Sequence, residues 1–139
     1  MLLLNIHLSA MLFSVAVIFF ADKEAFAWFS GKRATLCRKR VRTLHTLMWV
    51  GLLSLIGSGI LMFLPMASYL LSQPLFIIKL LFVAILVVNA VLVGRLMDTA
   101  ITHPRKEVSF AELLPLMTSG AVSTLSWIAA ILLAFYIFA

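Results

Sequence analysis

The sequence predicts an all-α membrane protein, a bundle of four transmembrane helices with both termini on the outer (periplasmic) side. Three observations lead to this prediction. Of the 139 residues, 64% are hydrophobic and only 12% are charged, whereas a soluble domain is about half apolar and about a quarter charged. The mean hydropathy is +1.16. The apolar residues form four continuous runs, and the basic residues collect between particular pairs of runs.

The four runs cover about residues 1–21, 44–64, 75–97 and 117–138. A helix rises ~1.5 Å per residue and the hydrocarbon core of a bilayer is ~30 Å thick, so ~20 apolar residues are enough to cross it. Backbone groups in lipid must bond within their own segment, so each run is expected to be a helix. Little sequence is left over, and we therefore expect a single domain.

The first run is followed by Ala25, Phe26 and Ala27, which resemble a signal-peptidase cleavage site. No lysine or arginine precedes the run, however, and several follow it, which is the reverse of a signal peptide. We therefore expect a retained helix. Phe26, Trp28 and Phe29 are expected to continue it as an interfacial turn or short helix, with the aromatic side toward the membrane.

Charges predict the direction of threading. Ten of the 11 basic residues lie in the first and third loops, and the second loop, residues 65–74, has no charge. Positively charged loops stay in the cytoplasm. Residues 22–43 are therefore predicted to form a basic cytoplasmic loop of a multi-pass protein in the cell inner membrane. The basic residues of the two loops are Lys23, Lys32, Arg33, Arg38, Lys39, Arg40, Arg42, Arg95, Arg105 and Lys106.

The basic stretch 32–42 also accounts for most of the net charge of +6. Beside a membrane, attraction to anionic lipid headgroups is worth ~1 kcal/mol per basic residue. Lipid headgroups are thus the expected partner, and nucleic acid is not. Cys37, the only cysteine, is expected to be a reduced free thiol, because one cysteine excludes an internal disulfide.

Prolines and one capping pattern mark the expected helix ends at the remaining loops. Pro65 and Pro74 are predicted to bracket the outer loop, and Pro104 and Pro115 the inner one. Ser109 precedes Glu112 by three residues, the spacing of a capping box, and predicts a helical turn that starts there.

Small and polar residues form stripes at helical spacing, which predicts a tight bundle because small side chains let helix backbones approach. Such faces also suit a homo-oligomer or a larger membrane complex. The stripes are His7, Met11, Ser14, Ile18 and Asp22 in the first helix, Gly51, Ser54 or Leu55, Ser58 and Met62 in the second, and Ser119, Ser123, Ser126 and Ala130 in the fourth.

Two polar residues interrupt the third run. Lys79 is about five residues inside it, so its side chain either snorkels to the outer headgroups or faces the bundle interior. Asn89 is close to the membrane midplane and is expected to hydrogen-bond to another helix, with Ser14 and Ser54 as candidate partners.

We also expect a contact for Asp22, the acidic residue at the inner end of the first helix. Asp22 should pair with Arg42 or Arg95 in an interfacial network at the inner surface.

These residues define one candidate site in the outer third. A ligand or transport pocket would be formed by His7, Ser58, Lys79 and Asn89, with Asp22 as the inner exit. His7 and Met62 match in depth and are the candidate ligands of a haem b. His7 and His45 are separated by roughly 20 Å along the membrane normal and cannot share one iron.

Other site chemistries find no support in the sequence. Three scattered histidines and one distant cysteine do not supply a zinc or copper site. The sequence has no paired carboxylates in a plausible pocket, no Ser-His-Asp set at one depth and no glycine-rich phosphate loop, so we do not expect an enzyme.

Three segments carry a family resemblance: FFADKEAF, LHTLMWVGLLSLIGSGILMFLP and PLFIIKLLFVAILVVNAVLVGRLM. With His7, they are similar to a broad group of small bacterial inner-membrane proteins that distantly resembles the membrane domain of copper-resistance D proteins. The resemblance covers most of the chain and implies a four-helix inner-membrane module linked to metal or redox handling. The matching residues are His7, Trp49 to Gly51, Ser58–Gly59, Lys79 and Asn89.

Three functions stay open at this point. The first is a module that binds haem, quinone or another small ligand in the outer pocket. The second is transport of a small solute, an ion or protons along a path lined by His7, Lys79 and Asn89. The third is a structural subunit of a membrane complex whose polar groups only hold the helices together.

Overall fold

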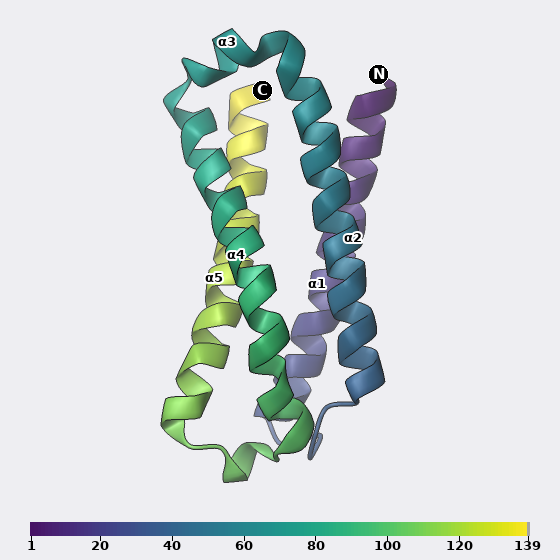
Figure 1. Ribbon diagram of the computed structural model, residues 1–139, viewed down its shortest axis with the longest axis vertical. Coiled ribbons are helices and arrows are strands. Elements are labelled where there is room, and N and C mark those ends of the chain that lie inside the picture. Colours follow the sequence, from purple (N-terminus) through teal and green to yellow (C-terminus); the bar gives the residue numbers. More distant parts are fainter. Residues whose placement is uncertain (139) are drawn as a thin grey trace.

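The computed structural model describes residues 1–138, and they fold into four long helices with short helical pieces in the connections (Figure 1). The elements in chain order are α1 (Leu2–Phe29), α2 (Arg38–Phe63), η1 (Leu64–Met66), α3 (Ala67–Leu71), α4 (Pro74–Thr102), η2 (Arg105–Glu107) and α5 (Phe110–Phe138). The four long helices are each long and apolar enough to cross a membrane, as predicted.

The helices begin where the sequence supplies a start signal. Pro74 occupies the first turn of α4, where its missing N–H costs no hydrogen bond. At the start of α5, the Ser109 N–H donates to Glu112 Oε2 at 3.1 Å and the Glu112 N–H donates to Ser109 Oγ at 3.4 Å. This reciprocal pair is the predicted capping box. Pro115, predicted to bracket the loop, instead lies inside α5.

All four long helices extend beyond the predicted apolar runs. Helix α1 continues to Phe29 and α2 begins at Arg38, so the expected basic loop of residues 22–43 contracts to residues 30–37. The apolar run measures only the part that lipid would cover, whereas backbone hydrogen bonding continues into the charged flanks. The turn after α1 uses Gly31 at φ +76°, a conformation that glycine adopts without strain.

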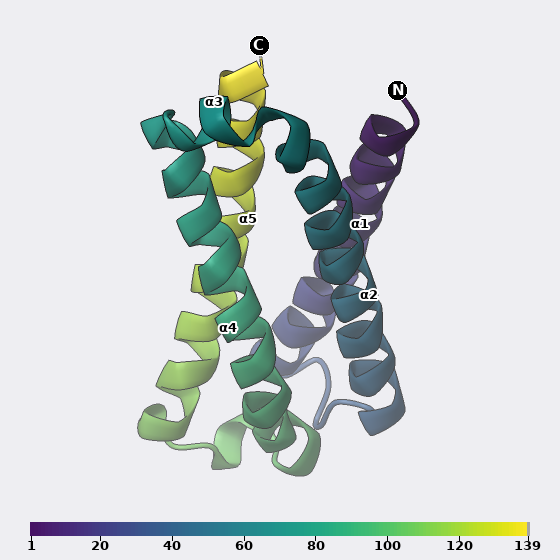
Figure 2. The same ribbon diagram turned by 45° about the horizontal axis from the view of Figure 1, so that its top comes forward.

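The helices pair as two antiparallel hairpins, α1 with α2 and α4 with α5 (Figures 1 and 2). Helix α3 crosses between them at the end where α1 begins and α5 ends. We call this the terminal end, and the opposite end, which carries residues 30–37 and 103–109, the loop end. All ten basic residues of the two loops, and all five acidic residues, lie toward the loop end. Lys79, near the start of α4, is the one basic residue toward the terminal end.

Two apolar clusters hold the hairpins together. One, in the middle of the bundle, contains Leu52, Leu86, Ala90 and Trp127. The other, at the loop end, is centred on Trp28, which is only 1% exposed. The loop contributes to this second cluster, because Leu36 is buried and its N–H donates to the Ala100 carbonyl of α4 at 2.9 Å.

Most of the apolar surface nevertheless points outward. Only 11% to 22% of the residues in the most apolar window of each long helix are buried. Exposed apolar patches beyond a few hundred Å² are rare on monomeric soluble proteins. The outer faces of the bundle therefore need lipid or a protein partner to cover them.

Candidate functional site

The α1–α2 hairpin closes on its small-residue stripes. Ser14 is fully buried against Gly51, and its hydroxyl donates to the Ala10 carbonyl of its own helix at 2.8 Å. A side chain at Gly51 would collide with the Ser14 hydroxyl. The close approach that the stripes predicted is confirmed at this crossing.

His7 and Ser58, two members of the predicted outer pocket, are in contact across this hairpin. Nδ1 of His7 lies 2.8 Å from Oγ of Ser58, and the Ser58 hydroxyl donates to the Ser54 carbonyl at 2.7 Å. A hydroxyl has one proton. With that proton on the Ser54 carbonyl, Nδ1–H of His7 is the donor to Ser58 and Nε2 presents its lone pair as an acceptor or ligand; with it on Nδ1, Nε2 carries the ring proton.

The two other outer candidates lie close to this pair. Met62 is half-buried one helical turn after Ser58. Lys79 is half-buried on α4 rather than fully exposed, and its charge acts on the His7 imidazole. His7, Ser58 and Lys79 thus all lie toward the terminal end, and His7 contacts Ser58 there.

Asn89 belongs to a different contact. It is buried and bonds reciprocally with Ser119 of α5: its Nδ2 donates to the Ser119 carbonyl at 3.1 Å, and the Ser119 hydroxyl donates to its Oδ1 at 2.8 Å. The expected interhelical bond is confirmed, but Ser14 and Ser54 as partners are wrong. Both of those serines bond to carbonyls of their own helices.

Asp22 also has a different partner from the expected arginines. It faces α5, where the Thr124 hydroxyl lies 3.5 Å from its Oδ2, a long hydrogen bond. The carboxylate that pairs with the basic loop is Glu24, which contacts both Arg33 and Arg40. Residues 22 and 24 are separated by about 200° around a helix, so only one of them faces the loop.

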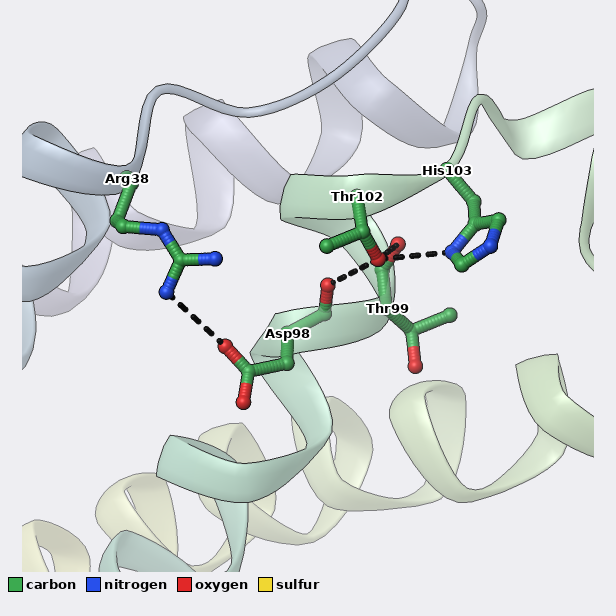
Figure 3. Close-up of polar contacts among 5 residues, drawn as sticks. All are labelled: Arg38, Asp98, Thr99, Thr102 and His103. Carbon is green, nitrogen blue, oxygen red and sulfur yellow. Dashed lines mark hydrogen bonds and ion pairs between the residues drawn. The ribbon is translucent and has the colours of Figure 1, made fainter.

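An exposed ion pair links the two hairpins at the loop end (Figure 3). Arg38 Nη1 at the start of α2 lies 3.7 Å from Asp98 Oδ1 of α4. The Thr102 hydroxyl donates to the Asp98 carbonyl at 2.7 Å and lies 2.7 Å from Nδ1 of His103. Both charged side chains are more than half exposed, and such pairs are worth at most about 1 kcal/mol. We interpret this cluster as a tie between α2 and α4.

Trp28 is the residue whose role the sequence did not reveal. It continues α1, as expected, but its side chain turns into the core rather than toward a membrane surface. Its indole N–H donates to the His103 carbonyl at 3.0 Å, so it joins α1 to the α4–α5 connection. No periodic pattern marks it, because its neighbours Phe26 and Phe29 are equally apolar.

A large cavity lies between the two hairpins. It measures about 820 Å³ and is walled by all four long helices. We call it the inter-hairpin cavity. Residues that define it are Val17 and Ala21 of α1, Met48 of α2, Ala90 of α4, and Gly120 and Thr124 of α5.

The cavity exists because the hairpins meet mainly along α2 and α4. There, Nε2–H of His45 donates to the Ala90 carbonyl at 2.9 Å, and the imidazole packs against the bare Cα of Gly94. Between α1 and α5, in contrast, the Asp22–Thr124 contact is the one hydrogen bond found among the described residues.

The walls of the cavity are mostly apolar, and the polar side chains in them include Asn89, Ser119, Asp22, Glu24 and His45. His45 is next to Asn89, because its Nε2–H donates to the Ala90 carbonyl. The sequence placed the candidate site in the outer third around His7, but His7, Ser58 and Lys79 do not line this cavity. Of the predicted site residues, Asn89 and Asp22 do.

Metal ligands do not converge among residues 1–138: no group of three or more His, Cys, Asp or Glu side chains is placed to hold an ion. Comparisons with protein-family models, with curated proteins and with solved structures find no match to this chain. The candidate site therefore rests on its own geometry.

Proposed function

We propose that this protein is a multi-pass protein of the bacterial inner membrane whose two hairpins hold an apolar small ligand in the inter-hairpin cavity. The observation that supports this function is the cavity itself, about 820 Å³ with mainly apolar walls. Ligand pockets typically measure ~300–1,000 Å³ and combine apolar walls with a few polar groups.

The polar groups suggest how the ligand is oriented. Asn89 and Ser119 satisfy each other, so they form a closed, neutral part of the wall. The polar groups with unused hydrogen-bonding capacity are Asp22, which makes only its long contact with Thr124, and Nδ1 of His45, which is left as an acceptor. We infer a ligand with an apolar body and a polar group, as in a quinone, that meets these two side chains.

An alternative ligand is haem b, which would bind at the terminal end instead of in the inter-hairpin cavity. His7 offers Nε2 in the tautomer whose Nδ1–H donates to Ser58, and such a second hydrogen bond orients a ligating histidine. Met62 would be the other axial ligand, as the sequence suggested. A visible spectrum of the protein, oxidised and then reduced with dithionite, distinguishes this alternative: a Soret band lost in His7→Ala supports haem at the terminal end.

A cavity-filling variant tests the proposed ligand site. Gly120 lines the cavity, and a Cβ atom there would meet no atom within 4 Å. Gly120→Leu should therefore begin in open space at the cavity wall and displace the ligand. Gly57→Leu is the matched control, because Gly57 has equally open surroundings but lies outside the cavity.

The measurement is the amount of each non-protein small molecule that is extracted from protein purified in mild detergent, by mass spectrometry. We expect one compound at near-stoichiometric level in the original protein and in Gly57→Leu, reduced at least tenfold in Gly120→Leu. If no compound is retained, or if both variants lose it equally, the ligand proposal is wrong and the structural-subunit alternative is favoured.

The orientation in the membrane is a separate part of the proposal. The ten basic residues at the loop end support a cytoplasmic loop end, with α1 beginning and α5 ending outside. Cys37 is exposed in the loop and serves as a natural probe. A membrane-impermeant maleimide should label it in inverted vesicles but not in intact spheroplasts; the opposite pattern would reverse the proposed orientation.

A further inference from the structure

A second hollow adjoins the inter-hairpin cavity where α1, the first loop and α2 meet at the loop end, and Glu24 and Leu44 line both. It measures about 410 Å³, and we call it the basic cleft. Three cations, one carboxylate and two apolar side chains form it: Lys23, Arg33, Arg40, Glu24, Phe20 and Leu44.

The carboxylate organises the cations. Arg33 Nη1 lies 3.1 Å from Glu24 Oε2, and Arg40 Nη1 donates to Glu24 Oε1 at 2.9 Å. The Glu24 side chain is only 16% exposed, whereas the two arginines are 41% and 52% exposed. Glu24 therefore lies below and holds both guanidinium groups from beneath, with their remaining N–H donors available to the cleft.

The charge of the cleft is unbalanced. Lys23 adds a third cation, so three positive charges face one negative charge. Arginine forks match the oxygen geometry of phosphate and bind it through paired N–H···O bonds. An anion with several oxygens is the occupant that this arrangement fits.

The apolar walls narrow the identity of the anion. Phe20 belongs to the first apolar run, its side chain is exposed, and Lys23 lies in the charged flank three residues later. Leu44 stands at the same boundary on α2. A free ion would make no use of these two side chains, whereas an acyl chain attached to the anion would lie along them.

We propose that the basic cleft binds the headgroup of an anionic phospholipid, with the phosphate between Arg33 and Arg40 and an acyl chain along Phe20. Attraction of basic residues to anionic lipid is general, but this site assigns it to the cations that Glu24 positions. The inference rests on the membrane location in the proposed function and does not depend on a ligand in the inter-hairpin cavity.

The test measures lipid binding to the detergent-solubilised protein by native mass spectrometry. The lipids are dioleoyl phosphatidylglycerol and dioleoyl phosphatidylcholine, which share their acyl chains. Changing Arg33→Gln and Arg40→Gln together should weaken phosphatidylglycerol binding about thirtyfold and leave phosphatidylcholine unchanged. Arg33→Gln alone, in the exposed loop, should weaken it about fivefold and decides the question if the double variant does not fold.

The matched control is Lys39→Gln with Arg42→Gln, which removes the same charge from exposed positions outside the cleft. We expect less than a threefold effect. Equal losses in the two double variants would show a diffuse charged surface and overturn the site. Displacement of the lipid by millimolar inorganic phosphate would overturn the assignment to phospholipid.

Glu24→Ala distinguishes a diffuse charged surface from a built site, because the two predict opposite changes in phosphatidylglycerol binding. The variant makes the cleft more positive, so attraction to a diffuse surface should tighten phosphatidylglycerol binding. If Glu24 positions the two arginines, binding should instead weaken, about fivefold or more. Tighter binding in Glu24→Ala would contradict the proposed site. The Gly120→Leu variant should bind phosphatidylglycerol normally, which separates this test from that of the cavity.

Discussion

Two glycines six residues apart on α2 should respond in opposite ways to the same substitution. Gly51 lies at the crossing with α1, where an added methyl group would collide with the Ser14 hydroxyl and lie 3.3 Å from Cδ1 of Phe13. Gly57 has no atom within 4 Å of the same position. The comparison of Gly51→Ala with Gly57→Ala therefore isolates the packing of α1 against α2.

The magnitude follows from two opposing effects. Alanine is favoured over glycine in a helix interior by up to ~1 kcal/mol, and both variants gain this. Overpacking a tight contact costs ~1–3 kcal/mol, and only Gly51→Ala pays it. We expect Gly57→Ala to raise the free energy of unfolding by about 0.5–1 kcal/mol and Gly51→Ala to lower it by about 1–2 kcal/mol.

The assay is equilibrium unfolding in dodecyl maltoside by increasing fractions of SDS, followed by far-UV circular dichroism. A second-site variant strengthens it. Ser14→Ala removes the colliding hydroxyl, whose own bond to the Ala10 carbonyl is local to α1. In the double variant with Gly51→Ala, at least half of the lost stability should return. The reasoning is refuted if Gly51→Ala is as stable as Gly57→Ala, or if Ser14→Ala brings no recovery.

Three further predictions concern other contacts. Asn89→Leu should lower the unfolding free energy by about 1–2 kcal/mol, because it removes two interhelical hydrogen bonds. The control Ser54→Ala should change it by less than about 0.5 kcal/mol, because the Ser54 hydroxyl bonds only to its own helix. Equal losses in the two variants would contradict this prediction. Gly94→Ala should cost about 1 kcal/mol in the same assay, because the added carbon would lie 3.0 Å from Cε1 of His45, and an unchanged cost in the His45→Ala background would refute that cause. Backbone N–H groups in the first turn of α2, helped by the adjacent positive charges, lower the pKa of the Cys37 thiol. Its alkylation rate should therefore reach half its maximum at a lower pH in the folded protein than after unfolding in SDS, and a rise in that pH on folding would contradict the assigned cause.

Several features followed from the sequence because they depend on local chemistry. The four apolar runs predicted the four long helices, since a segment of this length and composition must bond its backbone internally. The spacing of Ser109 and Glu112 predicted the capping box that starts α5. The grouping of basic residues marked one end of the bundle before any fold was known.

The sequence also indicated that Asn89 bonds to another helix, because an asparagine among apolar residues needs a partner. It could not identify Ser119 as that partner, since serines on three helices lie at similar depth. The sequence also could not decide whether Asp22 or Glu24 pairs with the arginines. The two residues lie on nearly opposite sides of α1, and the sequence does not determine which side faces the loop.

Tertiary structure alone decided where the candidate site lies. Small residues bring α1 to α2 and α4 to α5, but the two hairpins close mainly where His45 meets Ala90 and Gly94. The cavity beside this contact is in the loop-end half, whereas the sequence pointed to His7 at the other end. Lipid and protein interior are both apolar, so hydropathy determines which residues leave water but not which neighbour they meet; the packing of the helices determines that.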